Sequence, residues 1–154
     1  MNRPNKHRKP EPYSPQSIDE ASWLAIKGQR LVDAWPGIET HIAASIADSA
    51  VERMQLIRLD ALGRLLESTI IAHGTVDHLC ASVRYVAEQA LKDNTFGVIL
   101  AHNHTGGSAT PSWDDVTYTK SVHHAFKLLH ITLIDHLIVT KDKILSMRRN
   151  CLIF

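Results

Sequence analysis

The sequence predicts an α/β fold in which helices flank a mixed β-sheet. Two neighbouring segments, 51–59 and 65–72, have the apolar and β-branched content of strands, and a glycine-containing turn at 60–64 separates them as in a hairpin. Further along the chain, strand-like segments at 97–101 and 131–140 alternate with helical segments. Strands that are first paired by a hairpin and then separated by helices favour a mixed sheet with helices packed on it.

Length and composition are those of a globular domain. The 154 residues suffice for one compact unit with its own hydrophobic core. A hydrophobic fraction of 44% and a charged fraction of 21% are ordinary for soluble proteins. The net charge of +1 excludes a strong overall field that would recruit nucleic acid or a membrane surface. No apolar run approaches the roughly 20 residues that span a bilayer.

The cysteines and the N-terminal segment indicate the cellular compartment in which we expect the protein. Cys80 and Cys151 are too few for a disulfide framework and indicate unpaired thiols in a reducing cytoplasm. The first residues lack the apolar stretch of a secretory signal. We therefore expect a cytoplasmic protein without membrane association, and the sequence leaves its oligomeric state open.

The chain divides into three parts. Residues 1–17 are rich in proline and basic side chains and nearly free of apolar ones, which predicts a flexible basic tail. Residues 18–49 have helical patterning and form an N-terminal helical segment. Residues 50–154 make up the main α/β domain.

Within the helical segment, apolar residues recur at helical spacing from Ile18 onward. Ser17 and Glu20 have the spacing of a capping box, which predicts a helix start there. The letters "WPG" at 35–37 predict a break, followed by a second helix at about 38–47.

In the main domain, helices and strands alternate after the first hairpin. Apolar spacing predicts a helix at 83–92 and a longer one at 112–129. The strand at 97–101 is a short continuous apolar run, typical of a strand buried on both faces. Alternating side chains predict a strand at 131–140, and a last short strand follows at 144–148.

Two histidines, one residue apart, follow the buried strand. Residues i and i+2 of a strand point to the same face, so His102 and His104 can present their imidazoles side by side. The Gly-Gly pair at 106–107 permits a sharp turn beyond them. Ser112 then has the features of a helix N-cap, with Asp115 in the first turn. The loop is long enough to bring that turn beside the strand end.

Two neutral imidazoles and a carboxylate form a set of three metal ligands. Zinc with three protein ligands keeps its fourth position for water, which is the arrangement of a catalytic site. Non-haem iron also uses two histidines and one carboxylate, so the ligand set alone does not select the metal. Asp115 has a second interpretation, in which it hydrogen-bonds its own helix start, and this role does not exclude metal binding.

The spacing of these residues resembles a known signature. His102-Asn103-His104, followed after seven residues by Ser112 and after two more by Asp115, is similar to the His-x-His-x7-Ser-x2-Asp motif of JAB/MPN metalloprotease-type domains. The surrounding sequence resembles the bacterial RadC family in five stretches, namely "GTVDH" (74–78), "AL" (90–91), "VILAHNH" (98–104), "TPSWDD" (110–115) and "LIDHLIV" (133–139). The resemblance implies a JAB/MPN-like, cytidine-deaminase-like architecture for the main domain.

The resemblance also implies roles for individual residues. It implies Zn2+ held by His102, His104 and Asp115, with water in the fourth position. It further implies Ser112 as a donor to the oxyanion and a glutamate from an earlier strand as general base. Glu67 is the acidic residue on the expected strand, about two residues before the family position, and a β-bulge would absorb that shift. The other interpretation of Glu67 is an exposed strand glutamate.

The resulting prediction is a zinc-dependent hydrolase of peptide or isopeptide bonds, with a peptide or protein as substrate. Two alternatives stay open: a catalytically weak metal-binding or protein-interaction module, and a DNA-repair-associated protein without catalysis. Contact with nucleic acid would fall mainly to the basic tail, because the near-zero net charge gives the domain no phosphate-tracking stripe.

Overall fold

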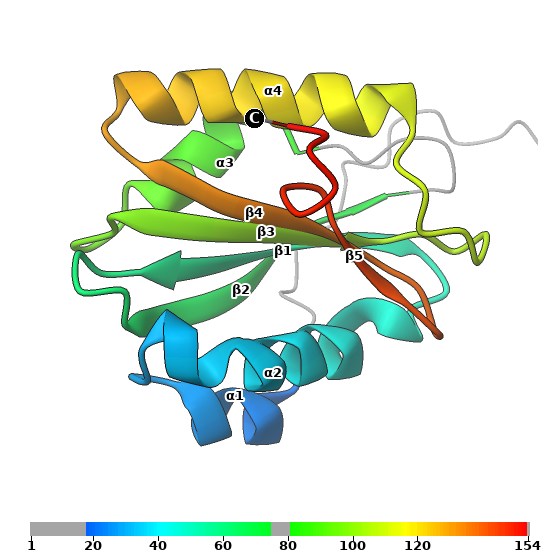
Figure 1. Ribbon diagram of the computed structural model, residues 1–154, viewed down its shortest axis with the longest axis horizontal. Coiled ribbons are helices and arrows are strands. Elements are labelled where there is room, and N and C mark those ends of the chain that lie inside the picture. The colour runs from blue at the N-terminus through cyan, green and yellow to red at the C-terminus, as the bar shows by residue number, and fades with distance from the viewer. Residues whose placement is uncertain (1–17, 75–80, 154) are drawn as a thin grey trace, which may run out of the picture.

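The computed structural model describes residues 18–74 and 81–153 and contains a five-stranded sheet with helices on both faces (Figure 1). The strands are β1 (Glu52–Leu59), β2 (Leu65–Gly74), β3 (Gly97–Asn103), β4 (Thr132–Val139) and β5 (Ile144–Ser146). The helices are α1 (Glu20–Ile26), α2 (Leu31–Ile42), α3 (Val83–Ala90) and α4 (Trp113–Leu128), and a π-helical turn, η1 (Ala43–Ala47), continues α2. Among the described residues, no helix is both long and apolar enough to cross a membrane.

The sheet is mixed, with the strand order β2-β1-β3-β4-β5. β1 runs antiparallel to both β2 and β3, β3 is parallel to β4, and β5 is antiparallel to β4. α4 makes the crossover between the two parallel strands, as such a pair requires. The predicted mixed sheet flanked by helices is therefore confirmed.

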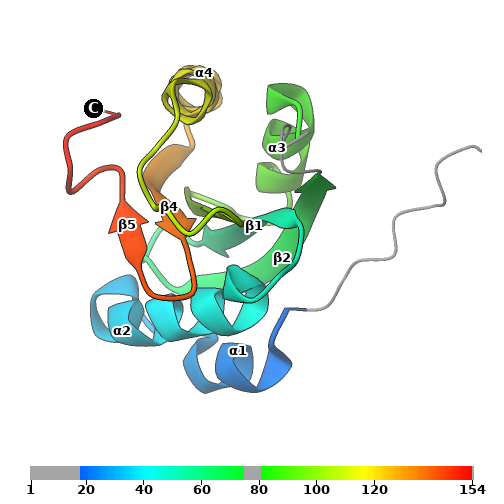
Figure 2. The same cartoon turned by 90° about the vertical axis from the view of Figure 1, so that its right-hand side faces the viewer.

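Each face of the sheet carries its own hydrophobic core. α1, α2 and η1 cover one face, and α3 and α4 lie side by side on the other (Figures 1 and 2). Because side chains alternate along a strand, β3 supplies Ile99 and Ala101 to the first core and Val98 and Leu100 to the second. β3 is buried along its whole length, as predicted for a strand covered on both faces.

The N-terminal predictions fall partly outside the described residues. The basic tail at 1–17, with Ser17 of the expected capping box, belongs to the part of the chain that the structure does not describe. α1 begins after Asp19, whose side chain accepts a hydrogen bond from the backbone N–H of Ser22 at 2.8 Å. The helix therefore has an aspartate as its N-cap.

The predicted break at "WPG" is wrong, because α2 runs through Pro36 and Gly37. A proline inside a helix removes one backbone hydrogen bond and costs about 3 kcal/mol, so the helix continues only where packing offsets that loss. Gly37 permits such packing: a Cβ atom there would lie 2.5 Å from Cγ2 of Ile26 in α1. The tertiary contact between the two helices overrides the local break signal.

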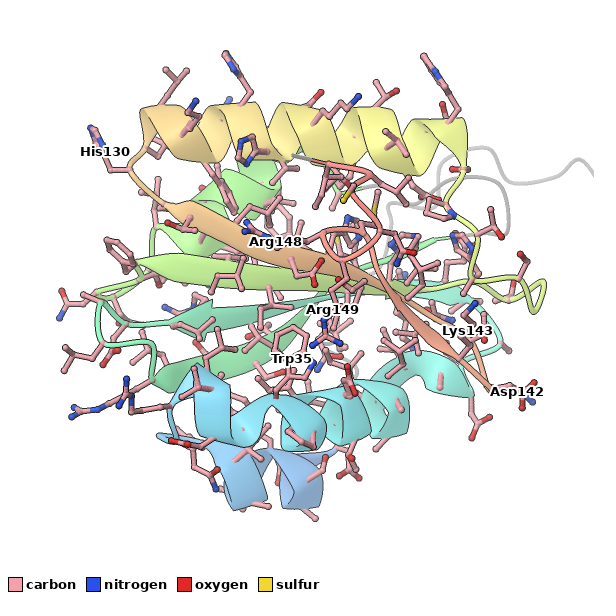
Figure 3. All side chains as sticks on the ribbon, in the orientation of Figure 1. Trp35, His130, Asp142, Lys143, Arg148 and Arg149 are labelled. Carbon is pink, nitrogen blue, oxygen red and sulfur yellow. The ribbon has the colours of Figure 1, made fainter. Side chains whose placement is uncertain are left out.

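The C-terminal turn lies along the edge of the sheet that β4 and β5 form (Figures 2 and 3). The Arg149 guanidinium lies over the Trp35 ring of α2, 4.9 Å from its centroid. The buried carboxylate of Asp135 in β4 accepts the Ser146 hydroxyl at 2.5 Å and the Arg148 backbone N–H at 3.1 Å. β5 ends at Ser146, two residues earlier than predicted, because the chain turns here toward these partners.

Candidate metal centre

The end of β3 delivers one histidine to the face covered by α4. His102 is 1% exposed and follows Val98 and Leu100 on that face. Asn103 points to the opposite side, where its Oδ1 accepts the Arg53 backbone N–H at 2.7 Å and its Nδ2 donates to the Val51 carbonyl at 3.1 Å. These two bonds fasten the end of β3 to the start of β1, so the strand tip is fixed in position.

His104 lies just beyond β3 and turns back toward His102. The two ring centroids are 4.8 Å apart. The Nδ1–H of His104 donates to the Ser108 carbonyl at 2.8 Å, which leaves the Nε2 lone pair directed toward His102. Gly107, with a φ of +82°, makes the turn that brings this carbonyl into place.

The first turn of α4 supplies the carboxylate. Ser112 is the N-cap, and its Oγ accepts the Asp115 backbone N–H at 3.0 Å. The backbone N–H of Ser112 in turn donates to Oδ2 of Asp115 at 2.7 Å. This reciprocal pair is a capping box, and it orients the Asp115 side chain.

The structure brings the three predicted ligands together. Nε2 of His102 lies 3.0 Å from Nε2 of His104 and 3.2 Å from Oδ1 of Asp115. Nε2 of His104 lies 3.2 Å from Oδ2 of Asp115. The side chains of His104 and Asp115 are 17% and 16% exposed, so one side of the cluster is open to solvent. These three are a possible metal-binding group among the described residues.

The close approach of the two imidazoles and the carboxylate is compatible with a tetrahedral zinc ion. With Zn–N and Zn–O bonds of about 2.0–2.1 Å, the edge of the coordination tetrahedron is about 3.3 Å. The two Nε2 atoms are 3.0 Å apart, and each lies 3.2 Å from a different oxygen of Asp115, Oδ1 for His102 and Oδ2 for His104, so each of these separations is close to that edge. Two nitrogen lone pairs and a carboxylate that converge at such distances repel one another, and a bound cation or proton relieves that repulsion.

The charges in the cluster are strongly coupled. Burial would raise the pKa of Asp115, but the contacts of its carboxylate with the imidazoles of His102 and His104 outweigh burial and hold that pKa far below its ordinary range. The hydrogen bond to Asp115 raises the pKa of His104 against the opposing effect of burial. The metal-free site therefore favours an ionised Asp115 paired with a proton on His104.

A second layer of hydrogen bonds stands behind His102. Its Nδ1 lies 2.7 Å from Nε2 of His136 in β4, and Nδ1 of His136 lies 2.6 Å from Oγ1 of Thr119 in α4. Burial lowers the pKa of His136 well below its ordinary value, and the nearby charge of His102 lowers it further. His136 is therefore neutral, and it orients His102 without reaching the open side of the cluster.

The expectation that Glu67 lies beside the cluster is corrected. Glu67 is paired with Arg58 across the hairpin, and Arg58 is in register with Val98 at the beginning of β3. His102 is four residues further along β3, a separation of about 13 Å at the usual strand rise. Glu67 forms an ion pair with Arg58 and is half exposed. It stands at the wrong end of the sheet for a general base.

Glu52, at the start of β1, is an acidic residue near the cluster in the described part of the chain, and it was not predicted from the sequence. Met54 is in register with His102, so Glu52, two residues earlier on the antiparallel strand, extends toward His104. Its negative charge contributes to the raised pKa of His104. The sequence alone could not identify Glu52. Its position two residues before Met54 places it near His104 only once the pairing of Met54 with His102 is known.

The fold and the site together define an α/β protein with a candidate two-histidine, one-carboxylate metal centre at the carboxyl end of a central strand. Comparison with known families is specific: the sequence model of the RadC-like JAB domain matches residues 33–152. The chain belongs to this family. The match begins within α2, so the family domain includes part of the helical segment.

Two curated relatives are similar along most of this chain. UPF0758 protein SPO0054 of Ruegeria pomeroyi is 34% identical over 120 residues, which is 78% of this chain and 54% of the relative. UPF0758 protein Bpet3149 of Bordetella petrii is 37% identical over 113 residues, which is 73% of this chain and 50% of the relative. The chain thus spans about half the length of these relatives.

Proposed function

We propose that this chain is a zinc-dependent hydrolase that cleaves peptide or isopeptide bonds. The observation that carries the proposal is the convergence of His102, His104 and Asp115: the two Nε2 atoms are 3.0 Å apart, each lies 3.2 Å from one oxygen of the carboxylate, and one side of the cluster is open. Membership of the RadC-like JAB domain family supports the reaction class. The substrate in this proposal is a peptide or protein.

The three residues would hold the ion and leave one coordination position for water. When bound, zinc supplies Lewis acidity, lowering the pKa of coordinated water from 15.7 to about 7 and polarising the scissile carbonyl. The chain contributes a preformed ligand set. The strand tip fixes His102, the Ser108 carbonyl fixes the ring of His104, and the capping box fixes Asp115.

In this proposal Glu52 is the general base in place of Glu67. Its carboxylate takes a proton from the attacking water and delivers it to the departing amine, a role in which a positioned acid–base group contributes about 10²- to 10⁴-fold. The register of β1 with β3, which pairs Met54 with His102 and so places Glu52 at the level of His104, supports this assignment.

Ser112 has a second role in the proposal. Its Oγ already accepts the Asp115 N–H, so the hydroxyl hydrogen remains for a developing negative oxygen on the substrate. Removal of one such donor typically costs about 3 kcal/mol of transition-state stabilisation. Ser112 is exposed at the beginning of α4, where a substrate has access to it.

A matched pair of variants tests the proposal. Glu52→Gln and Glu67→Gln each replace a glutamate of the first hairpin with an amide of the same shape. We expect both variants to bind about one zinc ion per chain, measured by mass spectrometry of the metal. Glu52→Gln should lose hydrolysis of fluorogenic peptide and isopeptide substrates by about 100-fold or more, whereas Glu67→Gln should keep wild-type turnover.

Four outcomes would count against the proposal. Full turnover by Glu52→Gln would remove Glu52 from the mechanism, and loss of turnover in Glu67→Gln alone would restore Glu67. A wild-type protein that binds no zinc, or that binds zinc and cleaves neither substrate, would contradict the assignment as a zinc hydrolase.

The proposal includes a compartment but no contact with nucleic acid. We place the reaction in the cytoplasm, where a reducing environment keeps an exposed thiol such as that of Cys151 unpaired. The contact with nucleic acid considered from the sequence depends on the basic tail, which lies outside the described residues, and it forms no part of this proposal.

A further inference from the structure

A buried chain of hydrogen bonds links α4, β4 and β3 behind the candidate metal centre. It joins Thr119 and His136, each 0% exposed, to His102, which is 1% exposed. The two links measure 2.6 Å from Thr119 Oγ1 to His136 Nδ1 and 2.7 Å from His136 Nε2 to His102 Nδ1. Neither Thr119 nor His136 has a part in the hydrolysis proposed above.

The direction of this chain follows from the single hydrogen of the Thr119 hydroxyl. Oγ1 of Thr119 lies 2.6 Å from the backbone carbonyl of Asp115, one helical turn earlier, and a carbonyl only accepts. The other acceptor nearby, the sulfur of Met147, is 3.8 Å away and is a weak acceptor. The hydroxyl hydrogen is therefore committed to the carbonyl of Asp115. Toward His136, Oγ1 has only lone pairs to offer, so Nδ1 of His136 must donate.

The positions of the hydrogens on the rings of His136 and His102 follow from the same argument. A neutral imidazole has one N–H, and His136 uses it at Nδ1, so its Nε2 is an acceptor. Nδ1 of His102 must then carry the hydrogen of the 2.7 Å bond. Nε2 of His102 is left with a bare lone pair, and this is the atom that faces His104 and Asp115.

We propose that Thr119 is a positioning residue that selects, through His136, the tautomer of His102 able to ligate a metal. The inference rests on the metal centre of the proposed function. The chain of hydrogen bonds ends at the backbone carbonyl of Asp115, which accepts the Thr119 hydroxyl, so one turn of α4 provides a ligand and also sets the tautomer of another ligand.

Without the Thr119 hydroxyl, the hydrogen bond between His136 and His102 can run in the opposite direction. His136 can then carry its hydrogen on Nε2 and donate to Nδ1 of His102. The hydrogen of His102 moves to Nε2, into the space that the metal requires. Outer hydrogen-bond partners of metal-bound histidines typically contribute about 10- to 100-fold in metal affinity.

The test compares Thr119→Val, which removes the hydroxyl at nearly constant volume, with Thr119→Ser, which keeps the hydroxyl. Long-range ¹H–¹⁵N spectra of the metal-free protein report which nitrogen of each histidine is protonated. At a pH of about 8.5, above the ordinary histidine pKa of about 6.5, we expect Nδ1-protonated His102 in the wild type and in Thr119→Ser. Thr119→Val should lose this tautomer. Thr119→Ala, which adds no bulk, replaces the valine variant if that variant does not fold.

Zinc titration against a competing chelator gives the second readout. We expect Thr119→Val to bind zinc about 10- to 100-fold more weakly than the wild type, with Thr119→Ser restoring affinity. Equal zinc affinity in Thr119→Val, or Nε2-protonated His102 in the wild type, would overturn the inference. If the wild type binds no zinc, the proposed function fails, and the tautomer of His102 in the metal-free protein alone decides the role of Thr119.

Discussion

Asp115 combines two roles that the sequence presents as alternatives. One carboxylate oxygen accepts the Ser112 backbone N–H at 2.7 Å while it faces His104, and the other oxygen faces His102 at 3.2 Å. The helix cap thus holds the carboxylate in the orientation that a metal needs. Its depressed pKa keeps the side chain ionised, as a metal ligand must be.

Zinc affinity should fall as the pH is lowered through the raised pKa of His104. Nδ1 of His104 is occupied by the Ser108 carbonyl, so the additional proton sits on Nε2, where it competes with the metal. Below that pKa the metal must displace a proton, and above it the lone pair is free. Because the pKa is raised from its ordinary 6.5, the loss of affinity begins above pH 6.5 on acidification.

Competition titrations with a chelator from about pH 5.5 to 8.5 measure this dependence, with about a tenfold loss per pH unit expected where one proton is displaced. Asp115 stays ionised over this range and adds no step of its own. An affinity that does not vary with pH would show that His104 is not a ligand.

The two histidines and the aspartate were predictable because their signals are local. Two-residue alternation places His102 and His104 on one side of a strand, and the capping spacing places Asp115 in the first turn of a helix. The proposed general base was not predictable in this way. Both Glu52 and Glu67 lie on strands, and only strand pairing decides which one approaches the histidines.

The meeting of β3 with the beginning of α4 builds the centre. β3 lies between β1 and β4, so its tip is held from both sides, and α4 returns over the same face. Val122 and Phe126 of α4 are fully buried against the sheet and fix the helix that carries Asp115. Rigid elements on both sides give a ligand set with little freedom to rearrange.

Ser112→Ala separates the capping role from the catalytic role at this junction. Loss of the N-cap should lower the free energy of unfolding by about 1 kcal/mol, measured by urea denaturation of the metal-free protein. Zinc affinity should change little, because the backbone N–H that holds Asp115 remains. Loss of the proposed oxyanion donor should lower kcat by about 100-fold or more.

Ser121→Ala is the control, because Ser121 is an exposed serine of the same helix that hydrogen-bonds only within its own turn in the described contacts. It should leave both unfolding and kcat nearly unchanged. Wild-type kcat in Ser112→Ala would restrict Ser112 to the cap.

The helices were predictable where local patterns agree with packing, and not elsewhere. Ser112 has every feature of a helix start, and the structure places the N-cap of α4 there. At Pro36 and Gly37 the local signals indicate a break, but α2 continues because close contact with Ile26 of α1 depends on the missing Cβ. Because the contact joins two helices, the local sequence of neither helix predicts it.

The molecule as a whole depends on two cores that share one sheet. The mixed sheet was predictable from the order of hairpin, strands and helices. The packing of the helical segment against the sheet was not predictable. Its apolar spacing shows only that one face of each helix is buried, and not which surface that face contacts. Ile38, Ile42 and Ile46 are at most 1% exposed and pack on the sheet face opposite the metal centre.

A chain that begins at residue 50 should therefore not fold. It lacks the helices that cover Ile57, Ile99 and Leu137, and exposure of such a face costs about 25 cal/mol per Å² of apolar surface. A chain that begins at residue 18 keeps every contact named above and is the matched control. Circular dichroism with urea should show a cooperative transition for the control alone, and a cooperative transition in the shorter chain would refute a shared core.

X-ray absorption at the zinc edge of the loaded protein tests the central claim most directly, because it reports the type and distance of the metal ligands. We predict one four-coordinate zinc site with two imidazole nitrogens and oxygen ligands at about 2.0–2.2 Å, from which Asp115→Ala removes the stoichiometric metal. A sulfur ligand, a shell of six oxygens or unchanged zinc in Asp115→Ala would contradict a centre formed by His102, His104 and Asp115.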